Sequence, residues 1–375
     1  MKFEVNFDAM KKAVMTIGKA VKKSSLEPAL IKIETGNDTV CLSLNGTVSI
    51  KMEVPARINE AGTFVTAFSA INVIAIRKTG GGMLKVESLD EGSLVLKYKQ
   101  AKTILSKNNT ELQVFDIKPE YPSVEIPVAA MKQMMKETVF ASDDNMDAEL
   151  HALKMVIAKD VEGLMKFSLS ACDRKTVAVR TGYAVENGSY TGESILLPEQ
   201  LKTALDVLDG DEENMKVAFG DKKVFLSYNG TVVSFPEVSK QFPDIENLLA
   251  SRKQCTFSVK LNREELLEAL NTVIYLQNIN QQVASNSSIE MTFSSAESTT
   301  TIKCTGITEY SEKLTAEIAG NMETPVYFSA ALLKQVVSFY PNENIIIGGT
   351  KSKAPFWMCC GENDEYIYCV MPKNH

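Results

Sequence analysis

Hydrophobic and polar residues follow the same order in three stretches of the chain. Each stretch opens with alternating apolar residues, as a half-buried strand does, and then changes to the spacing of an amphipathic helix. The stretches are KFEVNFDAMKKAVMTIGKAV from residue 2, VEIPVAAMKQMMKETVFA from residue 124 and FSVKLNREELLEALNTVIYL from residue 257. The helically spaced apolar residues are Met10, Ala13, Val14 and Ile17, then Met131, Met134, Met135 and Val139, then Leu266, Ala269, Leu270 and Val273. We therefore predict three copies of one unit.

A second strand followed by a helix lies about midway through each third. These stretches are GTFVTAFSAINVIAI, ESILLPEQLKTALDVL and TPVYFSAALLKQVVSFY, with Pro198 and Ser329 where a helix start favours them. Alternating strand and hairpin patterns follow each one. The joints EYPSVE and QFPDIE also repeat. We predict an α+β protein of three domains, residues 1–122, 123–250 and 251–375, each with two helices and antiparallel sheets.

Composition narrows the class of function. The chain has 375 residues, of which 45% are hydrophobic and 23% charged, as in an ordinary globular protein. Its start lacks the apolar run of a signal peptide, and no eighteen apolar residues run together, so no membrane partner is expected. The seven cysteines form no C-x-x-C pair and there are two histidines, so we expect reduced thiols, no metal site and no catalytic Ser-His-Asp group.

The formal net charge of −7 argues against nucleic acid, but the charges are unevenly spread. The acidic surplus lies largely in loop sequences, whereas cations lie on or beside the polar faces of the predicted helices. These cations are Lys11, Lys12, Lys19, Lys22, Lys23, Arg77, Lys78, Lys132, Lys136, Lys202 and Lys334. They are either an ordinary solvated face or a cationic lining that follows a phosphate backbone without reading bases.

The stretch SACDRKTVAVR, residues 170–180, crowds polar groups beside an apolar strand. Cys172 with neighbouring cations has the ingredients of an activated thiol, but His151 is the one available base. If the strand continued through this stretch, Cys172 and Arg174 would share one face while Asp173 and Lys175 pointed to the other. The groups would then fail to converge, which favours a polar binding rim over a nucleophile.

The opening MKFEV, the threefold layout, the FPD joint and the tail YIYCVMP resemble the bacterial DNA sliding clamp, the β subunit of DNA polymerase III, along the whole chain. The resemblance implies a cytoplasmic, non-catalytic protein without a cofactor. It implies a head-to-tail homodimer, a ring of six like domains whose helices face duplex DNA without sequence preference. The partners implied are the catalytic subunit of DNA polymerase III, the clamp loader and other proteins with a clamp-binding motif. His151 would lie near the DNA at the inner edge of the ring.

The resemblance also implies a pocket for a short hydrophobic partner peptide. Its residues here are Ala152, Cys172, Arg174, Lys175, Thr176, Val177, Pro243, Leu248, Cys369, Val370, Met371 and Pro372. The family usually reads A-T-D-G-H-R-L-A where this chain reads Ala171 to Ala178 as A-C-D-R-K-T-V-A. Because this segment is more basic, we expect a preference for peptides with an added acidic residue.

The ring would close where the strand of Thr103, Ile104, Leu105 and Ser106 meets Ile274, Tyr275 and Leu276 of a second copy. Such pairing would cover exposed sheet edges. Two alternatives stay open. One is a specialised clamp paralogue that binds peptides or proteins without forming a loaded ring, and the other is a thiol enzyme centred on Cys172.

Overall fold

The computed structural model divides the chain into two compact units. It describes residues 1–21, 28–78, 81–90, 92–112, 115–118, 121, 123–142, 150–160, 162–185, 191–208, 213–239, 241–279, 288–304, 309–360 and 365–373. Unit 1 comprises Met1–Lys132, Gly163–Met165 and Ala184–Val238, and unit 2 comprises Gln133–Glu162, Lys166–Tyr183 and Ser239–His375. The predicted middle domain contributes to both units, so the three domain boundaries remain predictions.

Each predicted strand-to-helix opening is present. The pairs are β1 (Lys2–Asn6) with α1 (Phe7–Gly18), β9 (Ser123–Pro127) with α3 (Val128–Thr138), and β17 (Phe257–Asn262) with α6 (Arg263–Ile279). An asparagine ends the strand in the first and third pairs. The Oδ1 of Asn6 accepts from the backbone N–H groups of Asp8 and Ala9, and Asn262 does the same for Glu264 and Glu265. These caps satisfy N–H groups that a helix start leaves unpaired, which fixes where α1 and α6 begin.

The second openings also form, with unequal helices. The strands β5 (Thr63–Ala67), β13 (Gly192–Leu196) and β21 (Val326–Phe328) precede α2 (Phe68–Ile71), α4 (Pro198–Val207) and α7 (Ala330–Phe339). In the first of these pairs α2 is a single turn that continues into the 3₁₀ turn η1 (Asn72–Ile74). Pro198 opens α4 and Ser329 precedes α7, as predicted.

In unit 1, β1 to β9 and β14 to β16 form one antiparallel sheet, whose main path is β8-β7-β6-β1-β4-β16-β15-β14-β9. Two strands, β2 and β3, continue it from β4, and β5 pairs with β2. The remaining bounds are β2 (Leu30–Thr35), β3 (Thr39–Leu44), β4 (Ser49–Glu60), β6 (Met83–Asp90), β7 (Ser93–Tyr98), β8 (Ala101–Ser106), β14 (Asn214–Gly220), β15 (Lys223–Tyr228) and β16 (Thr231–Pro236).

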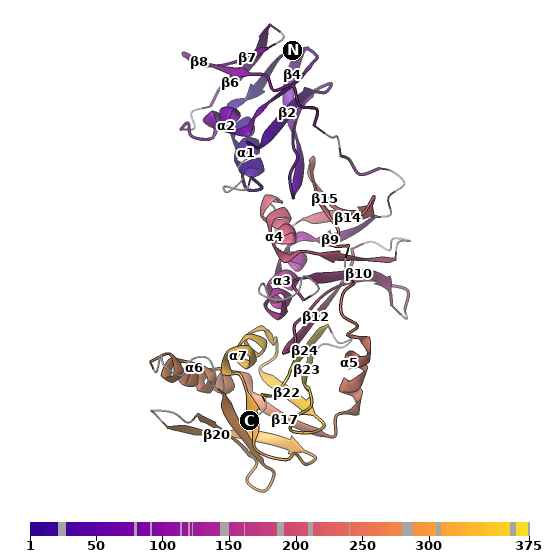
Figure 1. The fold of residues 1–375 in the computed structure, drawn as a ribbon, viewed down its shortest axis with the longest axis vertical. Coiled ribbons are helices and arrows are strands. Elements are labelled where there is room, and N and C mark those ends of the chain that lie inside the picture. The colour runs from indigo at the N-terminus through magenta and orange to yellow at the C-terminus, as the bar shows by residue number, and fades with distance from the viewer. Residues whose placement is uncertain are drawn as a thin grey trace. The chain divides into compact units, whose positions relative to one another are not determined.

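Unit 2 has a second antiparallel path, β10-β11-β12-β24-β23-β22-β17-β20-β19-β18-β21. Its helices α6 and α7 pack against each other (Figure 1). The remaining bounds are β10 (Leu153–Lys159), β11 (Met165–Cys172), β12 (Thr176–Tyr183), β18 (Ile289–Ser294), β19 (Thr299–Cys304), β20 (Tyr310–Ala319), β22 (Asn344–Gly349), β23 (Phe356–Cys360), β24 (Tyr366–Val370), η2 (Val139–Ala141), α5 (Glu246–Ser251) and η3 (Arg252–Gln254). Sequence patterns did not predict the short helix α5.

The apolar stripes predicted for the first helices form the core. Met10, Val14 and Ile17 of α1 are fully buried, as are Leu266 and Leu270 of α6. Burying one such side chain contributes about 1.5–3 kcal/mol, so these stripes hold each helix against its sheet. Among the described residues, none of the helices is both long and apolar enough to span a membrane. The predicted α+β class, with antiparallel sheets, is confirmed.

Candidate functional site

The polar stretch after Cys172 is a hairpin turn between β11 and β12. Asp173, Arg174 and Lys175 lie outside both strands. The Oδ1 of Asp173 accepts from the backbone N–H of Lys175 at 2.7 Å and from the Oγ1 of Thr176 at 2.8 Å. The strand does not continue through these residues, so the alternation of faces considered above does not apply to them. A carboxylate that bonds the backbone two and three residues ahead favours a turn over a strand.

The C-terminal tail runs beside this hairpin. Strand β24 pairs with β12, so that Val370 lies opposite Thr176 and Cys369 opposite Val177. Beyond the strand, the N–H of Met371 donates to the carbonyl of Lys175 at 2.8 Å. The structure thus brings together the hairpin and tail residues of the predicted peptide pocket.

Burial divides these residues into a floor and a rim. The buried residues are Cys172, Thr176, Val177, Cys369 and Val370, whereas Arg174 and Lys175 are exposed and Met371 and Pro372 are half-buried. Arg174 and Lys175 are therefore the most exposed residues of this set.

The remaining predicted pocket residues lie elsewhere in unit 2. Ala152 immediately precedes β10 and is fully buried. Pro243 is half-buried between Phe242 and Ile245, two buried side chains that anchor the FPD joint, and Leu248 is half-buried on α5.

The environment of Cys172 opposes thiol catalysis. Burial, and secondarily the negative charge of Asp173, raises the pKa of the Cys172 thiol to about 11. Since the thiolate is the reactive form, this thiol stays protonated near neutral pH. Among the described residues, no group of three or more His, Cys, Asp and Glu side chains is placed to hold a metal ion.

The predicted DNA-facing cations differ in how exposed they are. Lys12, Lys19, Lys78, Lys136 and Lys202 are exposed, and Lys11, Arg77, Lys132, His151 and Lys334 are half-buried. The Nζ of Lys11 donates to the carbonyl of Arg77, and that of Lys19 to the carbonyl of Asp206 at 2.6 Å. Lys22 and Lys23 lie outside the described residues. Helix α6 instead exposes Glu264, Glu265 and Glu268, so it does not share the cationic face of α1.

The residues predicted at the dimer interface are also unequally exposed. Ile104 on β8 is 55% exposed and Tyr275 on α6 is 67% exposed. Leu105 is buried in its own unit, and Thr103, Ile274 and Leu276 are half-buried. Ser106 is exposed, and its carbonyl accepts from the Oγ1 of Thr66 at 2.9 Å. Ile104 and Tyr275 therefore offer the larger apolar surfaces to a second chain.

No family model matches the chain. A β sliding clamp of Chlamydia muridarum is 20% identical over 376 residues, covering 99% of this chain and 98% of that protein. The crystal structure of the DNA polymerase sliding clamp of Bacillus subtilis is similar with a TM-score of 0.86 at 17% identity, over 100% of this chain and 99% of that one. The β subunit of DNA polymerase from Streptococcus pyogenes has a TM-score of 0.83 at 18% identity, over 100% of both chains.

These full-length matches confirm the fold and the resemblance to the sliding clamp that the residues indicated.

Proposed function

We propose that this chain, which has the fold and the full-length sequence resemblance of a bacterial β sliding clamp, closes as a head-to-tail homodimer around duplex DNA and tethers its partners there. The ring would consist of six like domains, three from each chain, in the cytoplasm. The observation that carries the proposal is a pair of equivalent joints inside the chain, together with the two strands that a third such joint would require.

Both internal joints add the last strand of one third to a long strand of the preceding third. In unit 1, β16 pairs with β4, with Val233 opposite Ile50. In unit 2, β24 pairs with β12, with Tyr368 opposite Ala178. Each joint continues a sheet from one repeat into the next through backbone hydrogen bonds.

A third joint would need one strand from each of the two remaining thirds. In the first third, β8 corresponds to β16, and in the last third β20 corresponds to β4. β8 follows a tight turn after Tyr98, just as β16 follows one after Tyr228, and Lys99 and Asn229 both have positive φ angles. β20 corresponds to β4, since each pairs with the first strand of its repeat through Ala316 and Ala56 respectively. Within the described residues, β8 ends its sheet path and residues 310–315 of β20 pair on one side, with β19. Pairing β8 of one chain with β20 of another supplies the third joint, with Thr103 opposite Tyr310 by the register of β16 on β4.

The ends of the helices support the same closure. At the first joint the end of α1 meets the end of α4 through Lys19 and Asp206. At the second, Phe140 and Phe339 stack with ring centroids 5.6 Å apart. The corresponding positions at the third joint are Tyr275, which follows the last buried residue of α6, and Ile76, which follows η1. Ile76 is 78% exposed. A second chain would bury Ile76 at this joint, and sequence reasoning missed the residue because periodicity within one chain does not report such a partner.

The DNA contacts would be made by the cations on the polar faces of α1, α3 and α4. Exposed lysines such as Lys12, Lys136 and Lys202 contact phosphates without reading bases. Each contact releases counterions and is salt-sensitive, which permits sliding, while the closed ring prevents escape.

The hairpin and tail would receive the partner peptide, including that of the catalytic subunit of DNA polymerase III and that of the clamp loader. Arg174 and Lys175 stand exposed on its rim, and the half-buried Lys373 follows the tail. Burial, and secondarily the positive charge of Lys175, lowers the pKa of Lys373, so these two cations lie close together. An acidic residue in the peptide would relieve this repulsion, which supports the expected preference for acidic peptides. If a panel of peptides shows no gain from Asp or Glu, that preference is wrong.

The basic hairpin also favours a second candidate, a specialised clamp that binds peptides or proteins without being loaded as a ring. The two functions differ in retention on DNA. The protein would be loaded on a nicked circular plasmid with its clamp loader and passed over a sizing column before and after linearisation. Co-elution with the circle and loss from the linear form supports a closed ring, whereas equal retention on both forms means ordinary affinity for DNA.

Two variants sharpen this test. Ile104→Asp places a charge at the proposed joint and is expected to abolish retention on the circle. Ile346→Asp makes the same change at an apolar residue on β22 that is 48% exposed and should be retained like the parent. A monomer in solution that is retained on neither DNA form would favour the peptide-binding module.

A further inference from the structure

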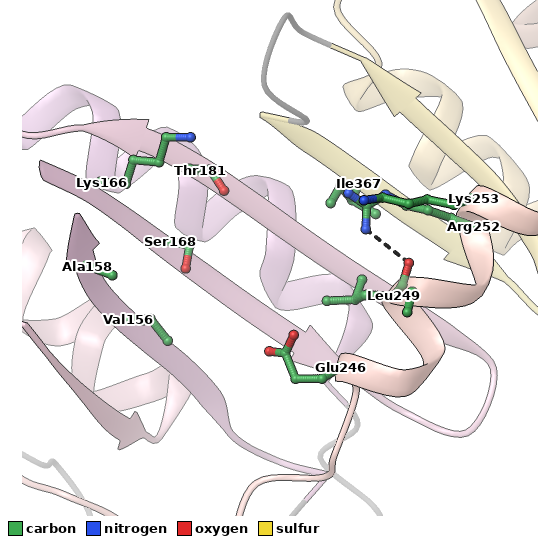
Figure 2. A pocket seen from close by; sticks show the side chains of 11 residues that line it. Val156, Ala158, Lys166, Ser168, Thr181, Glu246, Leu249, Arg252, Lys253 and Ile367 are labelled. Atoms are coloured by element: carbon green, nitrogen blue, oxygen red, sulfur yellow. Dashed lines mark hydrogen bonds between the residues drawn. The ribbon is translucent and has the colours of Figure 1, made fainter. Parts of the chain in front are cut away.

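A groove of about 470 Å³ runs along α5 in unit 2 (Figure 2). Its lining residues come from the sheet and from the helix with the residues that follow it: Val156, Ala158, Lys166, Ser168, Thr181, Glu246, Leu249, Ala250, Arg252, Lys253 and Ile367. None of the residues predicted for the peptide pocket lines this groove. It is therefore a separate site from the one described above.

The groove lies on the sheet face that points away from α3. Arg180 and Tyr366 lie opposite each other, and Arg180 is paired with Glu137 of α3, so these side chains mark the helix-covered face. Because side chains alternate along a strand, the next residues, Thr181 and Ile367, point to the other face. That face is turned away from the proposed DNA contacts of α3.

The predicted peptide pocket occupies the same face of the same strands. Cys172 lies opposite Val177, which in turn lies opposite Cys369 on β24. Val177 is four residues before Thr181 and Cys369 two residues after Ile367, so the parity of the strands places all of them on one face. Helix α5 contributes Leu249 to the groove, while its neighbour Leu248 is predicted for the pocket. The groove and the predicted pocket therefore lie on the same face of the sheet.

The groove combines an aliphatic surface with opposite charges at the two ends of α5. Val156, Ile367 and Leu249 supply the apolar surface (Figure 2). Glu246 is in the first turn of α5, whereas Arg252 and Lys253 follow its last residue. Lys166 lies 3.7 Å from Asp160, so its charge is partly balanced.

The cations at the far end of α5 are set up for a carboxylate. The NH1 of Arg252 donates to the carbonyl of Leu249 at 3.0 Å, which holds the guanidinium beside the apolar wall. Lys253 is exposed next to it. Charge-assisted hydrogen bonds from such groups to a carboxylate are among the stronger contacts that a protein surface offers.

We propose that this groove is an accessory subsite for partner proteins, which takes an aliphatic side chain on Leu249 and Ile367 and a neighbouring carboxylate on Arg252 and Lys253. The proposal rests on the peptide-binding part of the proposed function. A single-stranded nucleic acid fits less well, because none of the described residues that line the groove has an aromatic side chain on which a base would stack.

The test uses the full-length protein and fluorescent peptides that carry the clamp-binding segment of the polymerase III catalytic subunit. The segment is extended at either end by Ala-Leu-Asp-Ala, Ala-Leu-Asn-Ala or Ala-Gly-Asp-Ala, and binding is followed by anisotropy. At one of the two ends, the Ala-Leu-Asp-Ala extension is expected to lower Kd about tenfold relative to the unextended segment. At that same end, Ala-Leu-Asn-Ala and Ala-Gly-Asp-Ala are expected to lose most of this gain. No gain from Leu-Asp at either end overturns the proposal.

Matched charge reversals locate the effect. Lys253→Glu is expected to abolish the gain from the extension while the unextended segment binds as before. Lys216→Glu, at an exposed lysine on β14, should leave the gain unchanged. If both variants keep the gain, the groove is not the subsite.

A second readout separates this proposal from the proposed function. In methyl-labelled protein, titration with the isolated peptide Ala-Leu-Asp-Ala should shift the NMR signals of Leu249, Ile367 and Val156. If the clamp-binding segment fails to bind, the proposed peptide function fails, yet these shifts would still support the subsite. If the segment binds and the groove signals do not move with the extended peptide, the subsite is refuted and the proposed function stands.

Discussion

Replacing Arg180 with methionine is expected to destabilise unit 2 strongly. The Arg180 side chain is 9% exposed, its Nε is paired with Glu137, its NH1 donates to the Glu365 carbonyl at 2.5 Å, and its guanidinium carbon lies 3.3 Å from the Tyr366 ring centroid. The Glu137 carboxylate, which is 5% exposed and accepts from the amide of Gln133 at 2.6 Å, would lose its cation in Arg180→Met. Removing one partner of a buried ion pair costs roughly 3–5 kcal/mol, so we expect about 4 kcal/mol here.

The reciprocal change is expected to cost less. In Glu137→Gln the guanidinium keeps the Glu365 carbonyl and the Tyr366 ring, so its charge is only partly uncompensated. We expect the free energy of unfolding to fall by about 2 kcal/mol. In the double variant the loss should be smaller than the sum of the two single losses by at least about 1 kcal/mol. The reason is that the double variant removes both charges, so no buried charge is left without its partner.

The assay can be confined to unit 2, because Trp357 is the one tryptophan in the sequence. It is 4% exposed and lies opposite Cys369 on the neighbouring strand. Urea unfolding followed by Trp357 fluorescence therefore reports the unit that holds the ion pair, which matters since a chain with two units need not unfold in one step. A loss below about 1 kcal/mol for Arg180→Met, or strict additivity in the double variant, would refute the reasoning.

Three further predictions concern the surface, the DNA contacts and the thiol. If the chain forms the proposed dimer, Ile76→Asp should raise its dissociation constant in sedimentation analysis more than tenfold, since a charge replaces an apolar side chain at the proposed joint, while Ile346→Asp should not. Removing Lys136 or Lys202 should each lower the slope of log affinity for duplex DNA against log salt by about one, equally for all sequences; a sequence-dependent loss would contradict phosphate contacts. Labelling of Cys172 should speed up with pH until about 11, and a rate that levels off near pH 8 would show a lower pKa. Because the pKa is raised in the folded state, the thiol's contribution to stability is present below the unfolded value of about 8.5 and is lost as the pH rises through about 11.

The repeated openings were predictable because the burial of one face of each strand and helix leaves a periodic pattern in the sequence. The stripe of Met10, Val14 and Ile17 changes period from two to 3.6 after β1, and the structure buries all three. The turn at Asp173 was missed because the flanking residues continue the alternation of a strand, whereas a side-chain oxygen that accepts from Lys175 and Thr176 ends it. Helix α5 was missed since ENLLAS is a six-residue helix with no buried residue of its own, so periodicity carries little signal there.

The candidate interface shows why equivalent positions in the three repeats need not carry the same type of residue. Within the chain, the first helix joint uses Lys19 on a backbone carbonyl and the second uses the stacked pair of Phe140 and Phe339. Both are made by segments that the chain already tethers, so neither contact has to offset the free-energy cost of bringing two chains together. A joint between two chains must also offset the loss of translational and rotational freedom, which amounts to at least about 4 kcal/mol. Large apolar side chains such as Tyr275 and Ile76 at that position can supply this by burial. The repeat sets where the joints lie, and the joint without a covalent tether is the one whose contacts must also offset this loss of freedom.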